Sequence, residues 1–171
     1  MTSSAAVVPN ERARRGSFFA SPAGLFRGLA IAEAITWTLL ISALIARAVL
    51  GWALGVSLAG GIHGFVFLAY GATAILVAKN QRWRIGVSLA AIASAVVPYV
   101  TIPVEVWLHR SGRLAGAWRI EAGTDPRDAA WHDRLMRWFL RRPWVLVAVI
   151  AVAVVALFAV LLIAGPPVPK S

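Results

Sequence analysis

The sequence predicts an all-α integral membrane protein, a bundle of four hydrophobic helices with one interfacial amphipathic helix. Two observations carry this prediction. First, 60% of the 171 residues are hydrophobic and only 14% are charged, whereas soluble domains are roughly half apolar and a quarter charged. Second, the apolar residues are gathered into four runs, each close to the roughly 20 residues that span the hydrocarbon core of a bilayer. Lipid offers the backbone no hydrogen-bond partner, so each run should form a helix.

The first three runs, at residues 25–46, 54–78 and 85–108, define a membrane domain that we place at residues 25–110. The third run contains Pro98 and Pro103. Because proline removes a backbone N–H and disfavours helix before it, this run is either a kinked span or a re-entrant segment that returns to the side it entered. The fourth run forms a C-terminal transmembrane helix at residues 144–164. We interpret residues 1–24 as a disordered basic tail and residues 165–171 as a second tail.

The distribution of basic residues bears on these two topologies. If all four runs cross the membrane, the basic residues divide almost evenly between its two sides. If the third run returns, fifteen of the 17 Lys and Arg lie inside and only Arg47 and Lys170 lie outside. The positive-inside rule expects such a bias, but prolines in membrane helices usually produce an ordinary kink, so the sequence leaves both topologies open. The expected location is the bacterial cell (inner) membrane, crossed several times.

A basic loop at residues 111–143 separates the last run from the others. Within it, one helical face carries apolar side chains at i, i+4, i+7 and i+8, namely Trp131, Leu135, Trp138 and Phe139. Arginines occupy the rest of this segment, which is the pattern of a helix lying in the plane of the headgroups. We therefore expect these four residues to anchor the helix to an anionic inner leaflet. The net charge of +10 then reflects membrane topology, and we expect no nucleic-acid partner.

Ionisable groups inside the apolar runs are the candidate functional residues, because burying them in a membrane is costly. Glu33 lies about 10 Å inside the first run and Tyr70 lies at a similar depth in the second, at 1.5 Å per residue. Trp37 is one helical turn from Glu33, and His63 is two turns from Tyr70. We expect these four residues to form a polar seam, with a hydrogen bond between Glu33 and Tyr70. Replacing Glu33 by Leu should then cost more stability than replacing it by Gln.

Three glycines of the second run, Gly60, Gly64 and Gly71, are spaced for close helix packing. The chain contains no cysteine, which excludes disulfides and thiolate chemistry. It contains no recognised catalytic or phosphate-binding motif. One buried histidine supplies a single ligand, so we expect no metal or haem site and no other cofactor.

Several of these residues also match positions typical of a known protein family. The stretch from about Leu25 to Arg110 resembles a family of small bacterial integral membrane proteins of unknown function that is characterised by a His-Gly pair in its second helix. The matching positions are Arg27, Glu33, Ala34, Trp37, His63, Gly64, Phe67, Tyr70, Trp83 and Pro98. The resemblance implies an integral membrane domain and no particular activity. The basic loop and fourth helix depart from the family's usual three hydrophobic segments.

These observations favour a non-enzymatic membrane scaffold or subunit, as a homo-oligomer or with a membrane-protein partner. One alternative is a small oligomeric transporter or proton-coupled carrier that uses Glu33 and His63. A second is a membrane-embedded lipid-modifying enzyme with His63 as its base. Access to water separates these hypotheses. An open cavity at Glu33 and His63 would favour the alternatives, and a sealed seam would favour the scaffold.

Overall fold

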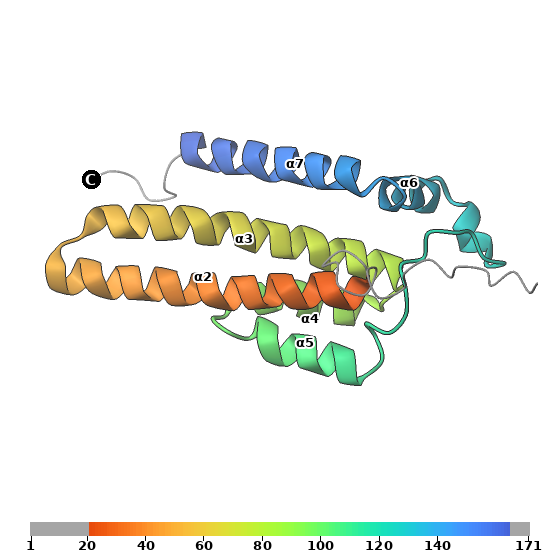
Figure 1. Cartoon of the computed structure of the whole chain (residues 1–171), viewed down its shortest axis with the longest axis horizontal. Helices are drawn as coiled ribbons and strands as arrows, with labels where there is room; N and C mark the ends of the chain where they lie inside the picture. The colour runs from red at the N-terminus through yellow and green to blue at the C-terminus, as the bar shows by residue number, and fades with distance from the viewer. Residues whose placement is uncertain (1–20, 165–171) are drawn as a thin grey trace, which may run out of the picture.

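The computed structural model describes residues 21–164, so residues 1–20 of the tail predicted at 1–24, and the tail predicted at 165–171, lie outside the described residues. Residues 22–24 of the predicted disordered tail are helical, which corrects that boundary. Every regular element within residues 21–164 is helical, which confirms the all-α prediction (Figure 1). The α-helices are α2 (Pro22–Leu50), α3 (Ala53–Asn80), α4 (Ile85–Ala93), α5 (Thr101–Arg110), α6 (Trp131–Leu140) and α7 (Pro143–Ala164). Two short 3₁₀ helices, η1 (Ser94–Val96) and η2 (Pro126–Ala129), complete the order.

Helices α2 and α3 form a long antiparallel hairpin, and local sequence signals set the ends of α2. Its N-terminus is capped by the Ser21 hydroxyl, which accepts a hydrogen bond from the Gly24 N–H at 3.0 Å. Pro22 occupies the first turn, where its missing N–H costs nothing. The helix therefore begins a few residues before the expected Leu25. The helix ends at Leu50, and it is followed by Gly51, whose φ of 70° lies in the left-handed region that favours glycine.

Three of the described helices, α2, α3 and α7, are long and apolar enough to cross a membrane. The expected count of four is not found, because the third run is broken into α4, η1 and α5. Val97, which precedes Pro98, is extended with φ −106° and ψ 126°, as steric conflict with the proline ring requires. Tyr99 then adopts a φ of 66°, which helical backbone cannot accommodate.

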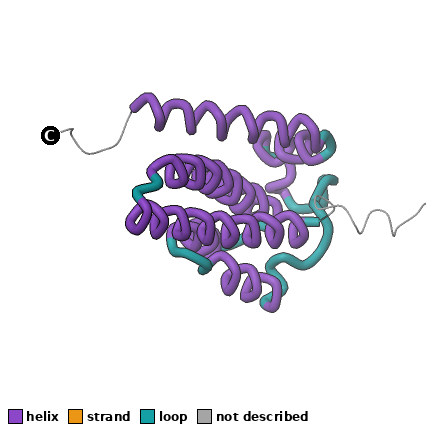
Figure 2. Tube along the Cα trace, turned by 60° about the vertical axis from the view of Figure 1, so that its left-hand side comes forward, coloured by secondary structure: helices purple, strands orange, loops and turns teal. Residues whose placement is uncertain are grey.

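The broken run reverses direction at residues 95–99. Tyr70 of α3 contacts Ala91 and Ser94 at the end of α4. Beyond the break, Tyr99 contacts Thr38, Thr101 contacts Ala30 and Glu105 contacts Arg27, so α5 runs back along α2. Both ends of the broken run consequently lie at the same end of the α2–α3 hairpin (Figures 1 and 2). This geometry matches the re-entrant topology and departs from a kinked span.

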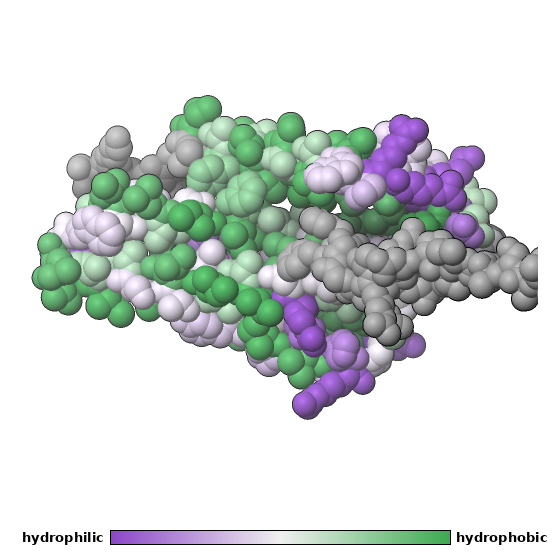
Figure 3. Space-filling view, viewed as in Figure 1, coloured by the Kyte–Doolittle hydropathy of each residue, from purple (hydrophilic) through white to green (hydrophobic). Residues whose placement is uncertain are grey.

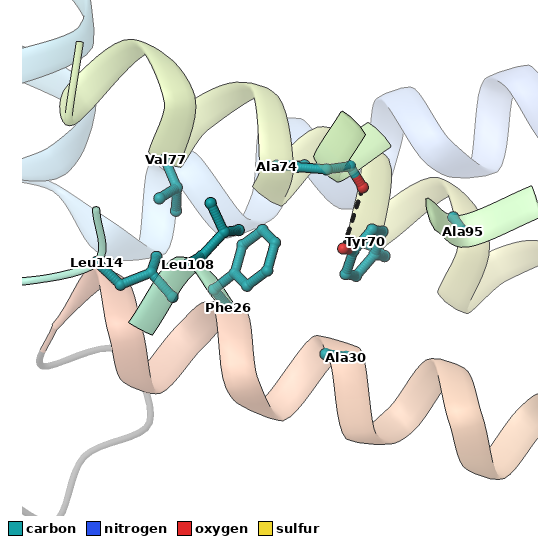
Figure 4. Packing of buried hydrophobic residues seen from close by; sticks show 9 residues of the cluster. Phe26, Ala30, Tyr70, Ala74, Val77, Ala95, Leu108 and Leu114 are labelled. Atoms are coloured by element: carbon teal, nitrogen blue, oxygen red, sulfur yellow. Dashed lines mark hydrogen bonds between the residues drawn. The ribbon is translucent and has the colours of Figure 1, made fainter. Parts of the chain in front are cut away.

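The buried core lies at that same end of the hairpin. Phe26 of α2, Tyr70 and Val77 of α3, and Leu108 of α5 are fully buried against one another (Figure 4). Phe26 is the centre of an aromatic group, with its ring centroid 5.4 Å from that of Tyr70 and 5.9 Å from that of Trp83. The broken run therefore fills the core beside the α2–α3 hairpin.

The surface is apolar over most of the long helices. Figure 3 shows hydrophobic residues along α2, α3 and α7, and hydrophilic residues gathered at the end where α6 lies. Helix α6 presents Trp131, Leu135 and Trp138 to the outside and buries Asp133 and Arg137. Large apolar side chains are therefore exposed on α6 beside the polar His132 and Arg134, whereas a helix that packs on a soluble core buries its apolar side chains.

Candidate functional site

The predicted polar seam brings Glu33 and Trp37 of α2 close to His63 of α3. Glu33 and Trp37 are four residues apart and therefore share one helical face. The rings of Trp37 and His63 pack with centroids 4.3 Å apart. Glu33 is 0% exposed and His63 is 8% exposed, so these groups are closed off from the surroundings of the protein.

Thr36, which sequence reasoning did not single out, connects the two helices. Its Oγ1 donates to the backbone oxygen of Glu33 at 3.0 Å, and the same oxygen lies 3.2 Å from Nδ1 of His63. The Thr36 hydroxyl accepts from His63 if Nδ1 is protonated and donates to Nδ1 in the other tautomer, so the donor in this contact depends on the tautomer of His63. The only feature of the sequence that could have indicated Thr36 is its position three residues after Glu33, on the same face of the helix.

The carboxyl group of Glu33 is the unusual feature of the seam. Both of its oxygens are buried, and neither has a hydrogen-bond partner among the described residues. The nearest ionisable group is His63, whose Nδ1 lies 3.9 Å from Oε2, beyond hydrogen-bond distance. Most buried polar side-chain atoms in proteins have a partner, so a carboxyl without one calls for a physical explanation.

The prediction of a hydrogen bond between Glu33 and Tyr70 is wrong. The Tyr70 hydroxyl donates to the backbone oxygen of Ala91 at 3.1 Å (Figure 4). It also lies 3.0 Å from Oγ of Ser94. Ser94 in turn donates to Ala91 at 2.7 Å. Matching two residues in depth did not fix the rotation of α3 about its axis, and this rotation directs Tyr70 toward α4. Tyr70 therefore holds the segment that turns back beside the hairpin.

Trp37 also holds this segment, since its indole N–H donates to the backbone oxygen of Ala95 at 3.3 Å. Glu105 of α5 is 6% exposed at its side chain and accepts from Nε of Arg27 at 3.0 Å. These contacts pin the turn and the return helix to α2. The part of the seam made by Trp37 and Tyr70 is therefore structural.

The three glycines do not share one packing partner. A Cβ at Gly60 would lie 3.9 Å from Leu40 of α2, and a Cβ at Gly64 would lie 3.3 Å from Phe158 of α7. A Cβ at Gly71 would meet no atom within 4 Å. Close approach of a neighbouring helix therefore requires a glycine only at Gly64.

A second polar cluster, which the sequence did not reveal, lies beside α6. Asp128 is buried and accepts from Arg82 at 2.6 Å, from Arg119 at 2.8 Å and from the Gly123 N–H at 2.8 Å. The Gly123 hydrogen bond, followed by the nearby arginines, lowers the pKa of Asp128. A neighbouring ion pair joins Lys79 to Asp133 at 2.9 Å, and it lowers the pKa of Asp133. These contacts attach the basic loop to the end of α3.

No group of three or more potential metal-binding side chains occurs in the part of the chain that the structure describes. The predicted anchor residues, Trp131, Leu135, Trp138 and Phe139, lie on α6, and Trp138 packs edge-on against Phe139 with centroids 5.0 Å apart. The site that remains is thus a closed polar seam within a helical hairpin.

The apolar helices and their buried polar seam define a helical membrane protein. Residues 23–110 match the model of the family described as a domain of unknown function, DUF3817, and the chain belongs to that family. It is also similar to a Streptomyces coelicolor protein that is named as a membrane protein, with 37% identity over 91 residues. That match covers 52% of this chain and 11% of the relative, so the chain spans only a small part of the relative's length. No solved structure matches the chain.

Proposed function

We propose that the chain is a non-enzymatic subunit of a membrane assembly, crossing the bacterial cell membrane several times. The observation that carries this proposal is the closure of the seam. Glu33 and Tyr70 are 0% exposed and His63 is 8% exposed, and the interior contacts of Trp37 and Tyr70 hold helices together. Interhelical hydrogen bonds of this kind, each worth about 1 kcal/mol, commonly stabilise membrane bundles.

The end of the α2–α3 hairpin near its connecting loop, at residues 49–54, is the surface that we expect a partner protein to contact. Its apolar side chains are strongly exposed, including Val49 at 74%, Leu50 at 77% and Leu54 at 62%. The similar Streptomyces coelicolor protein carries the matching segment as 11% of its length. A membrane domain that is a small part of a much longer protein fits a module that works beside other membrane segments. In this chain, the exposed half of the hairpin is the surface for such a neighbour.

The His-Gly pair gains a structural role within this proposal. His63 faces α2, where it contacts Thr36 and Trp37. Gly64, the next residue, allows Phe158 of α7 to approach. The pair would therefore fasten two different neighbours to α3, through a hydrogen bond on one side and close packing on the other.

The membrane placement completes the proposal. Helices α2, α3 and α7 cross the bilayer, the broken run is re-entrant, and α6 lies on the inner leaflet with Trp131, Leu135 and Trp138 toward lipid. This arrangement satisfies the positive-inside rule. The basic residues near α6 then face anionic headgroups.

Photocrosslinking in living cells tests the subunit proposal. A photoreactive residue at Val49 should give a crosslink to one other protein, whereas the same residue at the lipid-facing Trp138 should give lipid adducts only. Purification of the tagged full chain in mild detergent should recover the same partner in stoichiometric amount. A second copy of the chain would identify a homo-oligomer. A monomeric chain without a protein crosslink at Val49 would contradict the proposal.

A proton-coupled carrier is the second candidate, and the unpartnered carboxyl of Glu33 beside His63 favours it. It predicts proton flux in vesicles that contain the purified chain, with loss of flux in Glu33→Gln and retention in Tyr70→Phe. The lipid-modifying enzyme has weaker support, because His63 is only 8% exposed and its described hydrogen bond is with Thr36.

A further inference from the structure

Two cavities of different character meet beside α3. One, of about 540 Å³, lies where the end of α3 approaches the first residues of α4 and α6. The other, of about 370 Å³, lies between α3 and α7. Ile75 and Ile92 line both cavities, so the two spaces adjoin.

The first cavity is cationic and polar. Lys79, Arg82 and His132 line it, together with the hydroxyl-bearing Ser88 and the carboxylate of Asp133. Its cations belong to a set of ion pairs in which Arg82 also binds Asp125 and Asp128, and Asp128 binds Arg119 and Arg137. With His132 neutral and the Lys79–Asp133 pair included, four cations stand against three carboxylates, so the formal charge of this region is positive. The Lys79 ammonium carries three N–H donors, of which Asp133 at 2.9 Å receives one. The side chain of Lys79 is 39% exposed, so its charged end is accessible.

The second cavity is apolar. Phe67, Leu68 and Ala72 of α3 form one wall, and Ala153 and Leu157 of α7 form the other. From Lys79 to Phe67 is twelve residues of α3, or about 18 Å at 1.5 Å per residue. The hydrocarbon core of a bilayer is roughly 30 Å thick, so one leaflet is about 15 Å thick. The two adjoining cavities together therefore extend over a length close to that of one leaflet.

We propose that the joined cavity binds one anionic phospholipid. Its phosphate lies in the cationic cavity near Lys79 and Ser88, and one acyl chain extends along the α3–α7 cleft. Charge complementarity selects the headgroup, and the apolar cleft selects the chain. Basic pockets between membrane helices on the inner face are suited to such headgroups. This site is separate from the polar seam and does not depend on the subunit proposal.

Two pairs of matched variants test the two ends of the site. Ala153→Phe fills the apolar cleft, and Ala156→Phe places the same ring at an exposed position of α7 that does not line this cavity. Ser88→Asp adds a negative charge to the cationic cavity, and Ser88→Asn is its neutral counterpart. An acidic residue in the first turns of α4 is compatible with the helix dipole, so Ser88→Asp should fold.

The measurement is the binding of a fluorescent phosphatidylglycerol to the purified full chain in mild detergent, with native mass spectrometry of copurified lipid. We expect one bound phospholipid per chain. Ala153→Phe and Ser88→Asp should each weaken binding by at least about fivefold, the second through like-charge repulsion. Ala156→Phe and Ser88→Asn should bind as the parent does. Equal thermal unfolding within each pair would show that folding is intact.

Competition distinguishes a lipid from a free phosphate. Unlabelled phosphatidylglycerol should displace the probe, whereas glycerol 3-phosphate and inorganic phosphate should do so at least about tenfold less well, because they bury no acyl chain. Equal competition by glycerol 3-phosphate would overturn the proposal. So would binding that is unchanged in both test variants, or weakened in only one of them, because a single ligand must occupy both cavities.

Discussion

The carboxyl of Glu33 provides a quantitative test of the seam. Its two oxygens are buried without a hydrogen-bond partner, so the loss of hydration on burial is uncompensated. Leaving such a group unsatisfied costs about 1–3 kcal/mol. Glu33→Met keeps a similar unbranched shape and removes both oxygens. We therefore expect Glu33→Met to raise the free energy of unfolding by about 1–2 kcal/mol. This is less than the largest cost of an unsatisfied group, because imperfect packing of the methionine offsets part of the gain.

Two further substitutions give this prediction its controls. Glu33→Gln retains two polar atoms in the same position and should change the free energy of unfolding by less than about 0.5 kcal/mol. Tyr70→Phe removes the contacts with Ala91 and Ser94 and should lower the free energy of unfolding by about 1 kcal/mol. The sequence alone led to a different expectation, in which loss of the Glu33 carboxyl would leave Tyr70 without its partner.

The assay is reversible unfolding in mixed detergent micelles, followed by tryptophan fluorescence. Trp37 packs against His63 inside the seam and reports on its integrity. A loss of more than about 1 kcal/mol in Glu33→Met, with Glu33→Gln unchanged, would refute the reasoning. That result would mean that the carboxyl has a partner whose hydrogen bond an amide can replace.

Three other predictions address the rest of the fold. Gly64→Leu should lower the free energy of unfolding by about 1–3 kcal/mol through overpacking against Phe158, and Gly71→Leu, where nothing lies within 4 Å, should change it less; equal effects would contradict the α3–α7 contact. The lowered pKa of Asp128 means that its stabilisation is present above the ordinary value of 3.8 and is lost as the pH falls below it. Protease cleavage of the basic loop should therefore accelerate below about pH 4, whereas Asp128→Asn should be cleaved readily at neutral pH as well; pH-independent cleavage of the parent chain would oppose this role. Ser111→Cys, in a chain without native cysteine, should be labelled by an impermeant thiol reagent only after cells are opened, and labelling from outside intact cells would exclude the re-entrant topology.

The candidate site shows where sequence reasoning succeeds and where it ends. Depth within an apolar run follows from residue counting, which identified Glu33, Trp37, His63 and Tyr70 as interior polar residues. The structure brings Glu33, Trp37 and His63 together. Counting does not give the rotation of one helix against another, so the partner of Tyr70 was assigned incorrectly. Asp128 was missed because Arg82 reaches it from a distant part of the chain. Arg119 and Arg137 are nine residues away on either side, and only the fold of the loop brings them to it.

The sequence by itself determined the class of protein. Long apolar runs must become helices in lipid because their backbone groups have no other partner, and Pro98 prevents the third run from forming one continuous helix. Only the tertiary structure decided that this run turns back along α2, since a proline break permits both a kink and a reversal. The contacts of Tyr70 with Ala91 and of Thr101 with Ala30 select the reversal. Such contacts depend on helix rotation and long-range packing, which residue spacing along one chain does not encode.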